Sequence, residues 1–220
     1  MDGAAPIVLN AAERRVLGVL IEKGLTTPEY YPLSVHALAA GCNQKSNRDP
    51  LVSYDEAQVE RALRTLESKG HVRSVIGDTG RVARWRQELV RTLGLEVTEL
   101  AVVGELLLRG AQSEGDLRGR ASRMRPIETL ETLRALLQKL REPAPGRPAL
   151  VVRLSPEGAA RGVRWTHALP PPDPLEELRE PETETEPAGA PSDLARLGER
   201  VAALERRVAR LEGGGDRATP

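Results

Sequence analysis

The sequence predicts a mainly α-helical chain with small β-hairpins, a fold of the α+β class. Three observations lead to this prediction. A helical segment near the N-terminus recurs 86 residues later. Two further helical segments follow each copy, and each series ends in two β-branched stretches around a turn. The 220 residues leave room for two small modules, which we expect at 8–88 and 89–169, after a disordered N-terminus at 1–7.

The first helix is predicted over residues 11–23. Asn10 is a suitable N-cap, and Glu13 occupies the third helical position of a capping box. Gly24 should end the helix, because glycine readily adopts the left-handed conformation found there.

The repeat aligns residues 13–24 with residues 99–110, and both copies keep a glycine in the helix interior. These are Gly18 and Gly104. An interior glycine costs about 1 kcal/mol relative to alanine. We therefore expect another backbone to pack closely against each of them.

The second helices should begin after Ser34 and Ser113, over residues 35–40 and 114–121. A capping box of Ser53 and Glu56 should open the third helix of the first module. Its segment 63–66 recurs as 133–136. Three helices followed by a hairpin describe a winged helix, and its repetition favours two tandem winged-helix modules.

The hairpins are predicted at residues 71–87 and 150–167, and each return strand contains a tryptophan. Trp85 and Trp165 are interpreted as core anchors, with ligand stacking as the alternative.

Residues 26–34 (TTPEYYPLS) and 42–50 (CNQKSNRDP) resemble the YceH family of bacterial proteins. Residues 107–118 and 164–167 support the same resemblance, which covers about residues 8–169. Ala111 and the two hairpin tryptophans depart from the family pattern without affecting the expected fold. The resemblance implies a tandem winged-helix fold, but no biochemical activity.

Composition excludes several classes of function. Aromatic residues make up 2% of the chain, which argues against folds that stack bases on a sheet. Cys42 is the only cysteine, so neither an internal disulfide nor a cysteine-rich zinc site is expected. We recognise no catalytic set and no phosphate-binding glycine loop, so we expect no enzyme, cofactor or metal. The sequence shows no signal peptide or membrane span, which predicts a cytoplasmic protein without a membrane partner.

Basic residues suggest where a nucleic acid could bind. In a DNA-binding winged helix the third helix enters the major groove and the wing contacts the backbone. The predicted contacts lie in the loop after the second helix, on the third helix, in the wings and in an arginine run of the second module. They are Lys45, Asn47, Arg48, Arg61, Arg64, Arg81, Arg84, Arg86, Arg118, Arg120, Arg123, Arg125 and Arg164.

Each of these groups has a structural alternative. The third-helix face could be an ordinary solvated, salt-bridged surface, because Glu60 can pair with Arg64. The loop at 43–48 could bond its own backbone instead of a ligand. The third helix of the second module carries acidic residues in its first turn, which disfavours groove insertion there.

The C-terminal region predicts a tether and a coil. Residues 170–192 hold seven prolines and seven acids, which is typical of a disordered linker. A heptad seam follows in a coiled coil over 193–213, before a disordered end at 214–220. The seam consists of Leu194, Leu197, Val201, Leu204, Val208 and Leu211. Valine at a and leucine at d favour a parallel dimer; the alternative is a single amphipathic helix.

The net charge differs in sign between the two parts of the chain. Residues 1–168 carry 25 Lys and Arg against 20 Asp and Glu, and residues 169–220 carry 7 against 12. We therefore expect a dimeric, non-enzymatic regulator that binds duplex DNA through basic wing and helix residues. The alternative is a protein-interaction scaffold that uses the winged-helix modules as docking surfaces.

Overall fold

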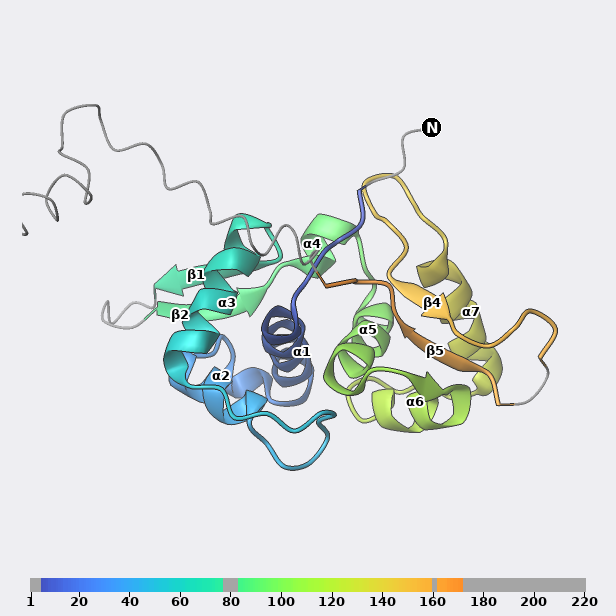
Figure 1. Ribbon diagram of the computed structural model, residues 1–220, viewed down its shortest axis with the longest axis horizontal. Coiled ribbons are helices and arrows are strands. Elements are labelled where there is room, and N and C mark those ends of the chain that lie inside the picture. The colour runs from blue at the N-terminus through green and yellow to red at the C-terminus, as the bar shows by residue number, and fades with distance from the viewer. Residues whose placement is uncertain (1–4, 77–82, 160–161, 172–220) are drawn as a thin grey trace, which may run out of the picture. The chain divides into compact units, whose positions relative to one another are not determined.

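The computed structural model describes residues 5–76, 83–159 and 162–171. The first half consists of α1 (Ala11–Thr26), a 3-10 turn η1 (Pro28–Tyr30), α2 (Val35–Cys42), α3 (Glu56–Ser68), β1 (Val72–Ile76) and β2 (Ala83–Gln87). The second consists of α4 (Leu89–Leu93), α5 (Val97–Arg109), β3 (Gln112–Ser113), α6 (Glu114–Ala121), α7 (Leu130–Arg141), β4 (Val151–Arg153) and β5 (Arg164–His167). Helices with small antiparallel sheets confirm the predicted α+β class (Figure 1).

Three predicted helix ends were wrong, and one of them is that of α2, which continues to Cys42 beyond the predicted end at residue 40. Helix α1 continues beyond Gly24, because the amide of Thr27 still donates to the carbonyl of Lys23 at 3.0 Å. Helix α3 is capped by Asp55 and Gln58, which exchange side-chain-to-backbone bonds of 2.6 and 3.0 Å, and not by Ser53 and Glu56. Helix α4, which links the modules, was not predicted.

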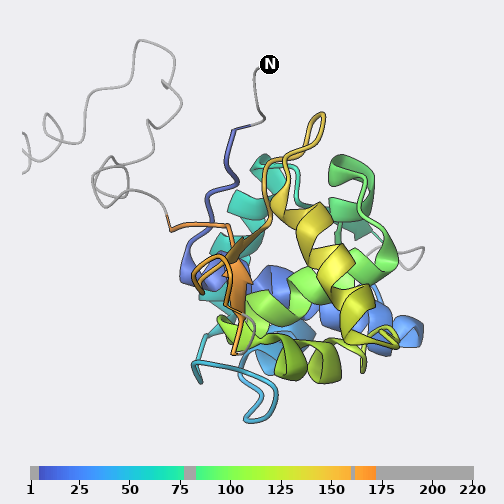
Figure 2. The ribbon, with the colours of Figure 1, turned by 90° about the vertical axis from the view of Figure 1, so that its right-hand side faces the viewer.

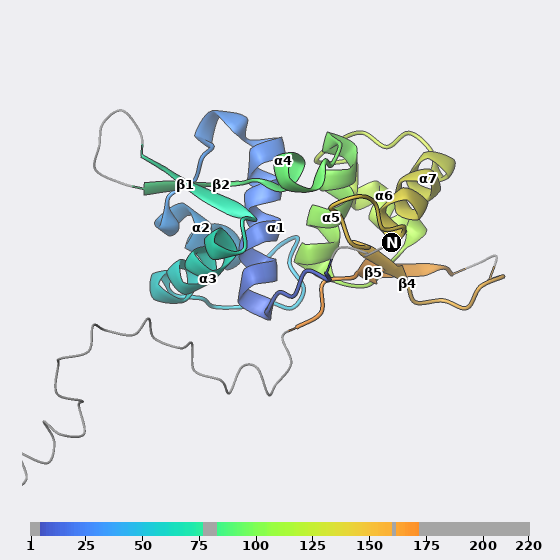
Figure 3. The ribbon, with the colours of Figure 1, turned by 90° about the horizontal axis from the view of Figure 1, so that it is seen from above.

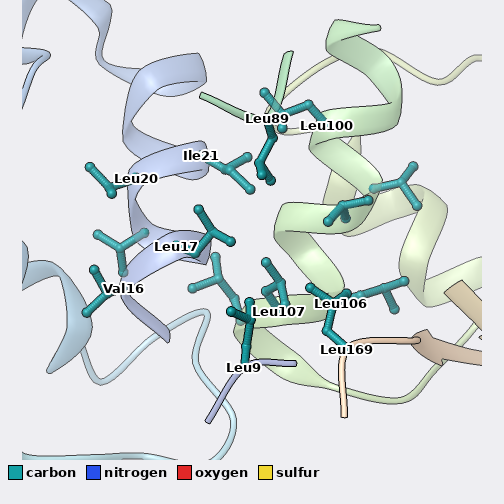
Figure 4. Packing of buried hydrophobic residues seen from close by; sticks show 14 of the residues in the cluster. Leu9, Val16, Leu17, Leu20, Ile21, Leu89, Leu100, Leu106, Leu107 and Leu169 are labelled. Atoms are coloured by element: carbon teal, nitrogen blue, oxygen red, sulfur yellow. The ribbon is translucent and has the colours of Figure 1, made fainter. Parts of the chain in front are cut away.

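Helices α1 and α5 pack against each other along their glycines. A Cβ on Gly18 would lie 3.2 Å from Cβ of Leu107, and one on Gly104 would lie 2.5 Å from Cγ2 of Ile21. Figure 4 shows Leu17 and Ile21 of α1 pointing toward α5, with Leu107 among the side chains between the helices. The expected close packing occurs at both glycines, but the nearest atoms belong to side chains of the facing helix and not to its backbone.

The two modules repeat the same contacts. Glu13 in α1 pairs with Lys69 after α3 at 2.8 Å, and the aligned Glu99 in α5 pairs with Lys139 of α7 at 2.9 Å. Both carboxylates are buried in these pairs. Aligned residues of the two halves therefore make the same buried ion pair.

The hairpins repeat as well. Trp85 pairs with Leu33 in an isolated bridge, and Trp165 pairs with Gln112 in β3. Both tryptophans are less than 9% exposed, which supports the core-anchor interpretation over ligand stacking.

Helices α3 and α7 lie on opposite sides of the α1–α5 pair, as Figure 3 shows from above. Figure 2, seen from the second module, shows α7 beside the β4–β5 hairpin. Among the described residues, no helix is both long and apolar enough to cross a bilayer.

Candidate nucleic-acid interface

The outer face of the β1–β2 hairpin carries three arginines. Arg73 lies opposite Arg86 and Val75 lies opposite Arg84 in the antiparallel register. Because side chains alternate along a strand, these four residues share the face opposite buried Trp85. All three arginines are exposed, so this hairpin presents a concentrated positive charge.

Two of these arginines are held by neighbouring groups. Arg84 donates to the carbonyl of Pro32 at 3.1 Å, and Arg86 pairs with Glu88 at 2.7 Å. Glu88 also binds Arg91 at 2.6 Å, and these guanidinium bonds, that of Arg91 first, hold its pKa below the usual range. Within the described residues Arg73 makes no ion pair. A guanidinium has five N–H donors, so Arg84 and Arg86 keep donors for a phosphate.

The acidic residues on the exposed face of α3 form ion pairs or hydrogen bonds with other groups of the protein. Glu56 binds His36 at 2.8 Å, Glu60 lies 3.5 Å from Arg64, and Glu67 accepts from the amide and hydroxyl of Ser74 at 2.9 and 2.8 Å.

Arg61 lies on the same face, is exposed, and has no ion pair among the described residues. Arg61 and Arg64 therefore stand on a helix whose negative charges are already partly compensated.

The prediction that Arg48 contacts a nucleic acid was wrong. Its side chain is fully buried and its guanidinium binds both carboxylate oxygens of Glu22, at 2.6 and 3.3 Å. It also donates to the Gly41 carbonyl and to the Gln44 side chain, at 3.0 and 2.9 Å. A phosphate cannot reach this group without breaking a buried ion pair, so Arg48 is removed from the proposed contacts.

The rest of that loop joins the modules. Asn47, which has a positive φ of 60°, accepts a hydrogen bond from Arg109 of α5. The amide of Asp49 donates to the carbonyl of Leu108 at 2.9 Å. Lys45 alone among the three predicted contacts of this loop is exposed. This loop is bonded within the protein, as the structural alternative expects, but mainly to α1 and α5 and less to its own backbone.

Three of the four arginines in the run predicted for the second module bind other groups of the protein. Arg118 donates to the carbonyl of Glu128 at 3.1 Å, and Arg120 donates to the Gln112 side chain at 2.7 Å. Arg123 lies 3.4 Å from buried Glu105. Arg125 is exposed and makes no hydrogen bond or ion pair within the described ranges.

Arg164 repeats the role of Arg84. It donates to the Ala111 carbonyl at 2.9 Å, just as Arg84 donates to the Pro32 carbonyl. The outer face of the β4–β5 hairpin differs from that of the first, because Val152 and Leu154 are 40% and 53% exposed there. Arg81 and the six predicted coiled-coil positions lie outside the described residues.

Sequence reasoning missed Arg73. The register of β1 against β2 places it beside the two predicted wing arginines, and strand alternation from buried Val72 could have revealed it.

Comparisons with known proteins agree with the resemblance predicted above. A model of the family described as "Protein of unknown function, DUF480" matches residues 9–160. A UPF0502 protein of Geobacter sulfurreducens is 45% identical over 210 residues, covering 93% of this chain and 90% of that protein. UPF0502 proteins of Pelobacter propionicus and Koribacter versatilis are 46% and 48% identical, covering 93% and 76% of this chain and 94% and 76% of their own lengths.

Proposed function

The chain belongs to the DUF480 family, and we propose that it is a tandem winged-helix protein that binds duplex DNA through its first module. The contacts are the outer face of the β1–β2 hairpin, with Arg73, Arg84 and Arg86, and the exposed face of α3, with Arg61 and Arg64. The observation that carries the proposal is the clustering of three exposed arginines on one hairpin face.

The geometry supports different roles for the hairpin arginines and the α3 arginines. Wing arginines suit phosphate oxygens, which position a protein without reading sequence. Arg61 and Arg64 lie on the helix that would enter the major groove, where arginine can read guanine. Because α7 lies on the opposite side of the α1–α5 pair, one straight duplex would engage α3 and not α7.

A docking role fits the second module better. The apolar side chains of Val152 and Leu154 on its hairpin are exposed, and the first turn of α7 contains acidic Glu131. An exposed apolar hairpin face suits a protein partner. The second candidate function is therefore protein docking by the second module.

The proposed protein is a homodimer joined through the seam from Leu194 to Leu211. The expected benefit is avidity, because two tethered first modules can engage one duplex together.

Salt-dependent binding of the full chain to duplex DNA tests the proposal. Arg73→Ala should flatten the log–log salt slope by about one unit and weaken binding to all sequences alike. Arg61→Ala should cost about 1–3 kcal/mol on a preferred site and little on random DNA.

Arg141→Ala is the matched control, because it removes one partly exposed arginine of the second module. Equal losses for Arg73→Ala and Arg141→Ala, or no binding at about 50 mM salt, would contradict the first-module interface.

A further inference from the structure

A cavity of about 230 Å³ lies where the two modules meet. Its walls come from the start of α1, from the loop that precedes α3, from the end of α5 and from β5. The polar lining residues are Arg14, Arg15, Asp49, Tyr54 and His167, and the other lining residues are Ala11, Pro50, Val52, Leu107 and Gly110. The volume is below the roughly 300–1,000 Å³ typical of drug-sized ligands, so it suits a molecule of a few heavy atoms.

Arg14 and Arg15 differ from three other arginines near the α1–α5 pair, which form ion pairs. Arg48 is paired with Glu22, and Arg109 and Arg123 are paired with Glu105. Neither cavity arginine makes an ion pair within the described residues. Their hydrogen bonds go only to backbone carbonyls.

The carbonyl bonds leave donors unused. Arg14 binds the carbonyls of Leu9 and Leu169 at 2.9 and 3.3 Å. Arg15 binds those of Cys42 and Pro50 at 3.1 and 2.6 Å, while its buried Nε has no partner. Arg15 is only 4% exposed, so the missing hydrogen-bond partner of its Nε costs free energy.

His167 adds a neutral donor to the same cavity. Its Nδ1 accepts from the amide of Leu169 at 3.3 Å, which places the ring proton of the neutral imidazole on Nε2. Burial, followed by the charge of Arg14, lowers the pKa of this histidine to about 4, so it is neutral at pH 7.

The charge balance favours an anion. Burial lowers the pKa of both arginines, and the neighbouring Arg48 lowers that of Arg15 further. Glu13 raises the pKa of Arg14 and Asp49 raises that of Arg15, but neither carboxylate forms an ion pair with these arginines among the described residues. Asp49 is the one acidic residue of the lining and is exposed. The first turn of the 16-residue helix α1 adds the positive end of its dipole at Ala11.

We propose that this cavity binds a small oxyanion, a carboxylate or a phosphate group, held by Arg14, Arg15 and His167. The occupant would touch α1, the loop before α3 and β5, and would thereby join the two modules. Its apolar remainder would lie against Leu107 and Val52.

Thermal unfolding of the full chain tests the site, with succinate and inorganic phosphate as probes and sodium chloride at matched ionic strength as the reference. A ligand at a hundred-fold excess over its Kd should raise Tm by about 5 °C in a saturable way. A rise with succinate alone assigns a carboxylate, and one with phosphate alone assigns a phosphate group. No rise beyond the sodium chloride reference overturns the proposal.

Variants test whether the rise in Tm comes from binding in this cavity. Arg14→Gln should weaken the apparent Kd at least about tenfold, since a charge-assisted bond is lost. Ala11→Glu should do the same by placing a carboxylate in the cavity. It suits the first turn of a helix, so the fold is kept. Ala11→Gln and Arg125→Gln are the neutral and remote controls and should retain the rise. Equal rises in Arg14→Gln, Ala11→Glu and the controls would overturn the proposal.

Discussion

Gly104 of α5 faces Ile21 of α1 so closely that a Cβ on the glycine would lie 2.5 Å from Cγ2 of the isoleucine. The aligned pair makes the reciprocal contact, because a Cβ on Gly18 would lie 3.2 Å from Cβ of Leu107. Aligned residues thus exchange roles across the interface. Within a single chain, α1 and α5 pack in the manner of an isologous dimer contact.

Gly104→Ala should lower the free energy of unfolding by about 1–2 kcal/mol, measured by urea denaturation. Overpacking against the stiff, β-branched Ile21 costs about 1–3 kcal/mol, which outweighs the helix propensity gained. Gly115→Ala in α6 is the control, because a Cβ there meets nothing within 4 Å and should stabilise the helix. Equal stability of the two variants would contradict the close packing.

Arg48→Ala should lower the free energy of unfolding by about 3–5 kcal/mol, because it leaves the buried Glu22 carboxylate without its partner. Arg61→Ala removes an exposed arginine and should stay within about 0.5 kcal/mol of the parent protein. Urea denaturation at pH 7 compares the two. A small effect of Arg48→Ala would show that the guanidinium is not enclosed.

Stability should fall as pH decreases from 6.5 toward 4, in part because of His167. Its pKa is about 4 in the folded chain against an ordinary value of 6.5, so in this window the unfolded chain binds a proton that the folded chain excludes. The contribution is at most about 3 kcal/mol and is reduced by partial exposure.

His167→Gln should flatten the plot of unfolding free energy against pH in that window. His36→Gln is the control, since its side chain is 84% exposed. Identical slopes for His167→Gln and the parent protein would exclude His167 as the source.

The proposed dimer should depend on the C-terminal region. A chain ending at Leu169 should sediment as a monomer in analytical ultracentrifugation, and the full chain as a dimer. Leu204→Asp should also give a monomer, because it places a carboxylate at a central d position. Ala203→Asp introduces the same charge outside the seam and should leave the dimer intact. Equal masses for the full and shortened chains would reject the coil.

The candidate DNA interface was predicted only in part. The sequence identified Arg84, Arg86, Arg61 and Arg64, because strand alternation and helical spacing indicate which residues share a face. It missed Arg73, although the same alternation applies to β1. It was wrong for Arg48, whose partner Glu22 lies 26 residues away on α1.

The sequence by itself determined the internal repeat and the order of the three main helices and the hairpin in each half, but not η1, α4 or β3. Capping residues, helical periodicity and turn glycines act within a few residues, and the same local signals occur twice. Close packing at Gly18 and Gly104 could also be expected, since an interior glycine needs a packing reason.

Only the tertiary structure decided which charges are free. Arg48, Arg84 and Arg15 read alike as basic residues, yet one is buried against a carboxylate, one stands on an exposed hairpin and one lines a cavity. A charge is neutralised by whatever lies within a few ångströms in space, and the packing of segments that are distant in the sequence sets those neighbours.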